Sequence, residues 1–208
     1  MSSRVPQTWV LASANAGKQR ELAALLAPLG IHLRLAAEWG LASAAETGST
    51  FQDNALIKAR HAAGVTALPA LADDSGLEVD ALGGRPGVYS ARFAGAEASD
   101  RQNNERLLAE LSGQPLEARS ARYRCVLALV RSADDPAPVL AEGSWEGRIA
   151  LAPAGSGGFG YDPLFIPAGE HLTVAELPAA LKQANSHRAR ASAALLSALH
   201  ATHGPEAR

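Results

Sequence analysis

Short apolar runs alternate with amphipathic stretches along the first part of the chain. Thr8–Ala12 (TWVLA) is almost continuously apolar, which is typical of a short buried strand. Lys18–Leu29 carries leucines at helical spacing and is followed by Gly30, so we expect a helix that ends at this glycine. Ile31–Leu35 alternates between apolar and other residues and predicts a second strand.

The next stretch predicts a helix and a strand that ends in a polar turn. Thr50, with Asp53 three residues later, is a variant of the capping box and predicts a helix that ends near Gly64. Leu68–Ala72 is an apolar run, and we expect its strand to stop where Asp73-Asp74-Ser75-Gly76 begins. Residues 79–95 (VDALGGRPGVYSARFAG) are rich in glycine, which indicates an irregular loop.

A helix and a hairpin are expected in the middle of the chain. Ser99 and Gln102 form a capping box at the start of the helix. Residues 120–130 (SARYRCVLALV) alternate and then become continuously apolar, as a strand does when it enters a core. Residues 138–149 (PVLAEGSWEGRI) are the expected partner of this strand.

Two helices are expected after the hairpin. Thr173 with Glu176 predicts a short capped helix, and Ser186 opens a last amphipathic helix that ends before Gly204. Helices alternate with strands early in the chain and a hairpin lies in its middle. This order favours an α/β fold with a mixed sheet, in which helices flank the strands.

Composition restricts the class of protein. The chain has 208 residues, of which 47% are hydrophobic, so one domain with a sizeable core is expected. No apolar run reaches the roughly eighteen residues of a membrane span, and the first residues lack the pattern of a secretory signal. The net charge of −2 provides no basic field for nucleic acids or anionic membranes. The single cysteine, Cys125, lies in an apolar strand pattern and is expected to be an inert core thiol. We therefore expect a cytoplasmic protein that binds a small molecule.

The turn after the first strand resembles a phosphate-binding loop. A Walker A loop requires G-x-x-x-x-G-K-[ST], but Ala12 occupies the first glycine position and Gln19 replaces the hydroxyl residue. The chain is therefore not expected to be a P-loop NTPase. Residues 13–17 still lead into a helix N-terminus, which favours anions, and Lys18 adds a positive charge there. The alternative is an ordinary strand–helix turn with a surface lysine.

Acidic residues next to this predicted anion site suggest a metal. Asp73 and Asp74 follow an apolar strand, and strand ends are where ligands bind in α/β sheets. Two acids in a small polar turn can hold a hard divalent cation, and Glu46 can add another oxygen ligand. Alternatively, one of the two aspartates caps a turn.

A second glycine-rich loop, residues 155–163 (GSGGFGYDP), contains two aromatic residues. Glycines let a ligand approach the backbone closely, and an aromatic ring held there can stack on a base. The alternative is that Phe159 or Tyr161 is a core residue. Farther along, Lys182, His187 and Arg188 surround a predicted helix start and offer donors for phosphate or carbonyl oxygens.

These segments together resemble one family. The chain is similar to the noncanonical purine nucleoside triphosphate pyrophosphatases (ITPase-like), which act on ITP, dITP and XTP. The resemblance is carried by LASANAGKQREL, ETGSTFQDNALIKARHAA, ALADDSGLEVDALGGRPGVYSARFAG, GSGGFGYDPLF and NSHR, which span the chain from Leu11 to Arg188. It implies an enzyme that releases pyrophosphate and leaves a nucleoside monophosphate. It also implies Mg²⁺ as cofactor, a homodimer, and one α/β domain (1–208) with a long mixed sheet and a cleft between two lobes.

The resemblance also implies roles for single residues. Asp74 matches the proton acceptor and a metal ligand, and Glu46 matches a second metal ligand. The matching substrate-binding residues are Ser13, Ala14, Asn15, Ala16, Gly17, Lys18, Ser75, Phe159, Gly160, Tyr161, Asp162, Lys182, His187 and Arg188. Lys58 lies on the same helix face as Asn54 and is a further candidate for phosphate contact.

Three other functions remain as alternatives. A Maf-like nucleotide pyrophosphatase shares the chemistry and acts on other bases. A nucleotide-sensing domain binds the ligand without turnover. An RNA-binding module that uses the glycine–aromatic loop is disfavoured, because the chain has no basic stripe.

Overall fold

The computed structural model describes residues 7–13, 16–42 and 44–202, and within them the side chains of all but 16–18, 21, 25 and 202. Its centre is a six-stranded sheet in the order β2-β1-β3-β4-β5-β6. The strands are β1 (Gln7–Leu11), β2 (Ile31–Leu35), β3 (Ala70–Val79), β4 (Ser120–Val130), β5 (Val139–Ile149) and β6 (Phe165–Pro167). β1 pairs in parallel with β2 and β3, whereas β5 and β6 are antiparallel. The predicted mixed sheet is confirmed.

Five α-helices flank the sheet in the described part of the chain: α1 (Ala16–Leu26), α2 (Phe51–Thr66), α3 (Asp100–Glu110), α4 (Ala179–Asn185) and α5 (His187–Thr202). Short 3₁₀ helices connect them: η1 (Ala27–Leu29), η2 (Ala36–Trp39), η3 (Asp80–Leu82), η4 (Gly87–Arg92) and η5 (Leu116–Ala118). No helix in these described ranges is both long and apolar enough to cross a bilayer.

Helix boundaries follow the capping residues expected from the sequence. Thr50 Oγ1 accepts a hydrogen bond from the backbone of Asp53 at 3.1 Å, which begins α2. Ser99 and Gln102 form the reciprocal capping box of α3. Gly30 has a φ of 73°, the left-handed conformation that glycine tolerates best, and it separates η1 from β2.

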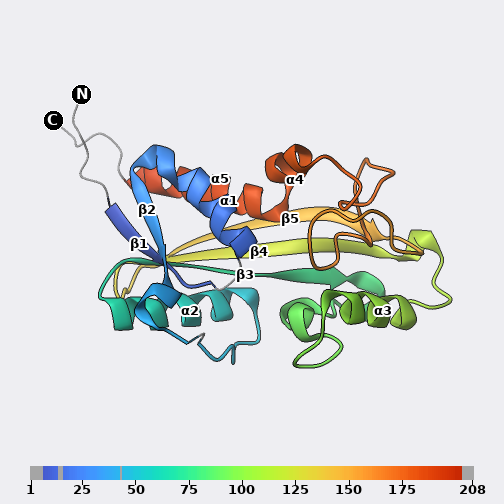
Figure 1. The fold of residues 1–208 in the computed structure, drawn as a ribbon, viewed down its shortest axis with the longest axis horizontal. Helices are drawn as coiled ribbons and strands as arrows, with labels where there is room; N and C mark the ends of the chain where they lie inside the picture. Colours follow the sequence, from blue (N-terminus) through green and yellow to red (C-terminus); the bar gives the residue numbers. More distant parts are fainter. Residues whose placement is uncertain (1–6, 14–15, 43, 203–208) are drawn as a thin grey trace. The chain divides into compact units, whose positions relative to one another are not determined.

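The chain divides into two compact units. Unit 1 comprises the described residues of Met1–Asp74, Val126–Glu142 and Ala191–Arg208, and unit 2 comprises Ser75–Cys125 and Gly143–Arg190. In unit 1, α2 lies on one face of the sheet, while α1 and the unit 1 part of α5 lie on the other (Figure 1). In unit 2, α3 and α4 lie on opposite faces (Figure 1).

Alternation along β4 builds the core of unit 2. Ala121, Tyr123 and Cys125 are buried, as predicted for the cysteine, whereas Arg122 between them is partly exposed. Ala121 and Tyr123 pack in one cluster with residues of β3, α3, β5 and the segment that follows it. The other members of this cluster are Leu77, Val79, Phe93, Leu107, Leu111, Trp145, Ile149, Tyr161, Leu164, Phe165 and Val174. This core anchors the glycine-rich loop 155–163, because Tyr161 belongs to both the core and the loop.

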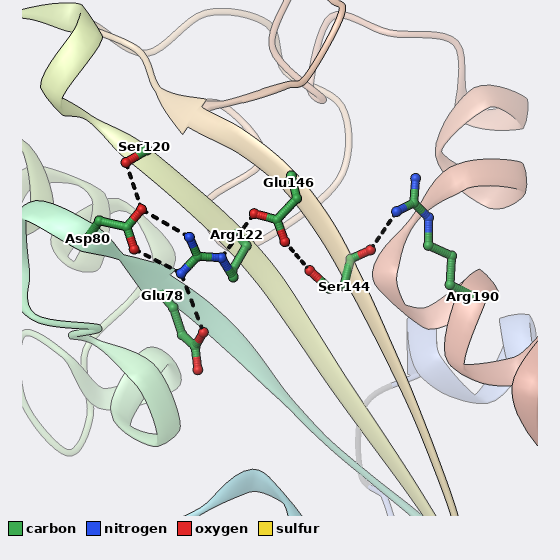
Figure 2. A network of polar contacts seen from close by, with 7 residues as sticks. All are labelled: Glu78, Asp80, Ser120, Arg122, Ser144, Glu146 and Arg190. Carbon is green, nitrogen blue, oxygen red and sulfur yellow. Dashed lines mark hydrogen bonds and ion pairs between the residues drawn. The ribbon is translucent and has the colours of Figure 1, made fainter.

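The polar side of β4 carries a network of charges. Figure 2 shows Arg122 between the carboxylates of Asp80 and Glu146, with Glu78 close by. Arg122 donates to both oxygens of Asp80, at 2.8 and 2.9 Å, and to Glu146 Oε2 at 2.9 Å. Ser120 Oγ donates to Asp80 Oδ2 at 2.7 Å.

The structure corrects the predicted end of the third strand. β3 does not stop at Asp73 but continues through Asp74 to Val79, so neither aspartate lies in a turn. β3 is a central strand between β1 and β4, and apolar positions resume at Leu77 and Val79, which are fully buried. A buried charge is tolerated inside a strand when a counter-charge accompanies it, and Lys58 provides one for Asp74.

The prediction near Thr173 is also wrong. Thr173 and Glu176 make the capping contacts, because the backbone N–H and the hydroxyl of Thr173 both lie 2.9 Å from Glu176 Oε2. These contacts close a turn, and α4 begins only at Ala179, after Pro178. Lys182 therefore lies inside α4 and not at a helix start. The three-residue strand β6 was not predicted, because so short a segment has no readable period.

Candidate functional site

The predicted site residues occupy both units. Unit 1 contains the turn after β1, together with Glu46 and Asp74. Unit 2 contains Ser75, the loop 155–163 and the segment with Lys182, His187 and Arg188.

The strand and the helix that flank the turn expected to bind phosphate are both present. β1 ends at Leu11 and α1 begins at Ala16. Ala12 N donates to Leu71 O at 2.9 Å, which extends the pairing with β3, and Ser13 is half-buried. Ala14 and Asn15 lie outside the described residues, as do the side chains of residues 16–18. Phosphate binding by this turn remains a prediction.

The acid–lysine cluster consists of Glu46, Lys58 and Asp74 and lies in unit 1. Lys58 Nζ lies 2.6 Å from Asp74 Oδ1 and 3.0 Å from Glu46 Oε1. Lys58 and Asp74 are 8% and 7% exposed, so both charges are withdrawn from water. Glu46 and Asp74 were predicted to share a metal site. Lys58 was predicted to contact phosphate, and its pairing with the two acids was not predicted.

The helix α2 determines where Lys58 points. Asn54, one turn earlier on the same helix face, is fully buried, and its Oδ1 accepts from Gly48 N at 2.8 Å. This bond holds the segment that follows Glu46. A Cβ at Gly48 would come within 2.5 Å of Asp53 Cβ, so a glycine is required for the segment to lie this close to α2. The sequence did contain a signal for the burial of Lys58. It lies at helical spacing with the small or uncharged residues Asn54, Ala55, Ala59 and Ala62, which form the buried face of α2.

Electrostatics keep Lys58 protonated. Burial acts to lower the pKa of Lys58, but the charge and hydrogen bond of Asp74, and then those of Glu46, outweigh it and raise the pKa. Lys58 is therefore an ammonium ion at neutral pH. The cluster consists of two carboxylates in contact with one buried cation.

The two carboxylates also suit a divalent metal. Mg²⁺ is usually bound by one or two carboxylates, with substrate phosphates and water completing its shell. Both Glu46 and Asp74 contact the same Lys58 nitrogen, so their oxygens already converge on one point that a cation occupies. Within the described residues no set of three or more His, Cys, Asp or Glu side chains forms a metal site. The donor set therefore fits a metal that shares its coordination with a ligand.

A small pocket adjoins the cluster in unit 1. Its volume is about 90 Å³. It is lined by Ala12, Ser13, Ala36, Ala37, Leu41, Ala42, Ala44, Lys58, His61 and Ala62. Lys58 and Ser13 thus line one cavity, although they lie on different elements.

In unit 2, the glycine-rich loop presents one aromatic ring and buries the other. Phe159 is 38% exposed, and Lys182 Nζ lies 4.2 Å from the centre of its ring. Tyr161 is 4% exposed, and its hydroxyl donates to Ser90 O at 2.8 Å. Tyr161 therefore matches the alternative of a core aromatic, whereas Phe159 has a ring available for stacking.

Asp162 organises this loop. Its buried carboxylate accepts from Phe159 N at 2.9 Å and from the hydroxyl of Tyr123 at 3.2 Å, and it forms an ion pair with Lys182. Gly158 has a φ of 77°, and a Cβ there would approach Asp162 Oδ2 to 2.0 Å. The absence of a side chain at this position lets the loop close on the carboxylate.

Two side chains of helix α3 form hydrogen bonds with the same loop. The backbone N–H of Gly160 donates to Asp100 Oδ2 at 2.6 Å, and Asn104 Nδ2 donates to Gly160 O at 2.8 Å. These two residues were missed in the sequence, where only the capping role of this segment was visible.

The remaining predicted residues lie at the start of α5. His187 is the first residue of α5 and is 5% exposed, and its ring stacks on that of Tyr123 with a centroid separation of 4.7 Å. Arg188 is 2% exposed, and its Nη2 lies 3.3 Å from Ser75 Oγ. Ser186 Oγ accepts from Ala189 N at 3.2 Å and caps the helix, which was predicted to begin at this residue. Unit 2 thus brings Ser75 and Arg188 together, and Asp162 and Lys182 together.

Comparison with known proteins identifies the family. A model of the Ham1 family matches residues 9–198. The dITP/XTP pyrophosphatase of Shigella flexneri is 54% identical over 193 residues, which are 93% of this chain and 98% of that protein. The dITP/XTP pyrophosphatase of Xanthomonas campestris pv. campestris (strain 8004) is 56% identical over 192 residues, 92% of this chain and 96% of that protein. The HAM1 protein from Coxiella burnetii has a TM-score of 0.89 at 45% identity, with 95% of this chain and 100% of that chain covered, and confirms the α/β fold. On these matches, the chain belongs to the Ham1 family.

Proposed function

We propose that this chain hydrolyses dITP, XTP and ITP to the nucleoside monophosphate and pyrophosphate. The observation that carries the proposal is the similarity to dITP/XTP pyrophosphatases, at more than half identity over nearly the whole chain. The acid–lysine cluster supports it with the charges that such a reaction needs.

The proposed reaction is attack of water at the α-phosphorus. The water oxygen forms a bond to phosphorus, the bond to the bridging oxygen of the β-phosphate breaks, and pyrophosphate leaves. Asp74 accepts the proton of the attacking water. Lys58 favours this role because its ammonium donates to one oxygen of Asp74 and holds that oxygen in place.

Positive charge is required around the triphosphate. Glu46 and Asp74 would hold the divalent cation, which neutralises phosphate charge when it is bound. The turn before α1 and Lys18 would add backbone dipoles and a further charge. Mg²⁺ as this cation, a homodimeric enzyme and a cytoplasmic location are parts of the same proposal.

Unit 2 would recognise the base. The exposed ring of Phe159 offers a stacking surface, and Lys182 contacts the face of that ring. Hypoxanthine and xanthine carry an O6 acceptor, whereas adenine carries an amino donor at the same place. Donors from His187 and Arg188 would pair with O6 and remain unpaired against adenine, at a cost of about 1–3 kcal/mol each.

A substrate panel tests the proposal. Purified protein is assayed with ITP, dITP and XTP, with and without Mg²⁺, and the product is scored as pyrophosphate or phosphate. We expect Mg²⁺-dependent release of pyrophosphate. Turnover restricted to dTTP, UTP or CTP would indicate a Maf-like enzyme, and nucleotide binding without turnover would indicate a sensing domain.

A further inference from the structure

Tyr123 touches two of the predicted base-binding residues. It lies on β4 in the core of unit 2, where it is 8% exposed. Its hydroxyl donates to Asp162 Oδ1, and one face of its ring stacks on His187. Asp162 belongs to the glycine-rich loop and His187 to the start of α5. One side chain therefore supports two separate segments of the chain.

The hydroxyl completes the set of donors around Asp162. Phe159 N and Lys182 Nζ both contact Oδ2, and Tyr123 contacts Oδ1. With both oxygens engaged, the carboxylate has little freedom to rotate, and Lys182 and the backbone of Phe159 are positioned by it. Burial first, and then the charge of Asp162, raises the pKa of Tyr123, so the hydroxyl keeps its proton at neutral pH.

The ring of Tyr123 fixes the plane of the His187 imidazole. The two rings are nearly parallel, with an interplanar angle of 14°. Phe165 packs against Tyr123 at a centroid distance of 4.6 Å and a tilt of 57°, so the tyrosine ring is itself held in the core. The direction in which the imidazole nitrogens point therefore depends on Tyr123.

We propose that Tyr123 is a positioning residue for base recognition, which acts through its hydroxyl on Asp162 and Lys182 and through its ring on His187. The inference rests on the proposed function and adds a determinant in the core of unit 2. Tyr123 contacts no member of the acid–lysine cluster among its described contacts, so its effect is on substrate affinity and not on the chemical step.

Two substitutions separate the hydroxyl from the ring. Tyr123→Phe removes the bond to Asp162 and keeps the stack on His187, and we expect KM for dITP to rise about three- to tenfold. Tyr123→Leu removes both contacts, and we expect a rise of about thirtyfold or more. In both variants kcat is expected to stay within about threefold of the wild type, since the reacting groups are untouched. Trp145→Phe is the matched control, because Trp145 also packs on Phe165 but contacts neither Asp162 nor His187 in the described interactions.

A measurement without substrate accompanies the kinetics. The amide of Phe159 donates to Asp162, so its hydrogen exchange is expected to accelerate in Tyr123→Phe and to remain unchanged in Trp145→Phe. If KM in both Tyr123 variants matches that of Trp145→Phe, the positioning role is overturned while the proposed function stands. If the wild type hydrolyses none of the nucleotides, the proposed function fails. Unchanged exchange at Phe159 in both Tyr123 variants would overturn the inference independently of any turnover.

Discussion

Asn104 Nδ2 donates to the carbonyl oxygen of Gly160 at 2.8 Å, while Asp100 on the same helix accepts from the N–H of that glycine. Both polar groups of one backbone residue are thus held by side chains of α3. Glycine has no side chain of its own to fix a conformation, and these two contacts replace that constraint. Helix α3 therefore constrains the loop that carries Phe159.

Loss of the Asn104 contact is expected to weaken substrate binding. Asn104→Ala leaves the partly buried carbonyl of Gly160 without its donor, and we expect KM for dITP to rise about three- to tenfold with little change in kcat. The control is Asn103→Ala. Asn103 is the neighbouring asparagine on α3, and it bonds to the backbone of Ala91 and Ala94 and not to the loop. Equal KM values in the two variants would contradict this role of Asn104.

Substitution of Asp74 is expected to remove the chemical step. In Asp74→Asn, kcat should fall by about two to four orders of magnitude, because an amide cannot accept the proton of the attacking water. Circular dichroism should show a retained fold, since asparagine has nearly the same shape. Asp73→Asn is the matched control, because successive side chains of a strand point to opposite faces of the sheet. Near-wild-type turnover of Asp74→Asn would remove Asp74 from the mechanism.

Removal of the cation from the acid–lysine cluster tests metal binding directly. Lys58→Met removes the buried cation that contacts both carboxylates, which is expected to destabilise the protein by about 3–5 kcal/mol. Mg²⁺ should restore part of this loss, so the gain in Tm on adding Mg²⁺ should be larger in the variant than in the wild type. Glu46→Gln combined with Lys58→Met removes one of the two carboxylates and should abolish the extra gain. An equal Mg²⁺ effect in all three proteins would argue against a metal at this place.

The network in Figure 2 predicts a loss of stability in acid. Hydrogen bonds from Arg122, followed by one from Ser120, lower the pKa of Asp80 below its ordinary value of 3.8. A lowered folded-state pKa stabilises the protein above the unfolded-state pKa, and this contribution is lost as the pH falls through the folded-state value. Because Asp80 is partly exposed, the contribution is expected to be below about 1 kcal/mol.

Urea unfolding at pH 7 and at pH 3 measures this contribution. Asp80→Asn should lose less stability than the wild type between the two pH values. Glu105→Gln, which removes an exposed i,i+4 pair with Arg101 on α3, serves as the control and should follow the wild type. If the free energy of unfolding of Asp80→Asn changed with pH as much as that of the wild type, the pairing of Asp80 with Arg122 would make no measurable contribution to stability.

Much of the fold was readable from local patterns. The strands Ile31–Leu35 and Ser120–Val130 were predicted with their observed bounds, because alternation and apolar runs are local properties. The caps at Thr50 and Ser99 were also predicted, since a capping residue and its partner are close in sequence. The end of β3 was wrong, because a pair of aspartates normally marks a turn and the compensating Lys58 lies on another element.

The site was predicted only in part, because contacts between different elements cannot be inferred from local sequence patterns. Glu46, Asp74, Asp162 and Lys182 were identified as candidates from motifs, but their partners depend on the fold. Lys58 contacts Asp74 from α2, and Tyr123 contacts Asp162 from a strand that the pattern showed only as buried. A tyrosine in an alternating strand has the same sequence signature whether its hydroxyl supports a loop or merely fills the core.

The ammonium group of Lys58 is attached to the chain through its own side chain, which holds it next to the two acids. This attachment has a consequence for experiments on cation binding. A tethered ammonium has a local concentration that dilution of the protein does not change. Monovalent salt therefore competes poorly with Lys58 for the two carboxylates, and added KCl alone is not expected to displace it from them.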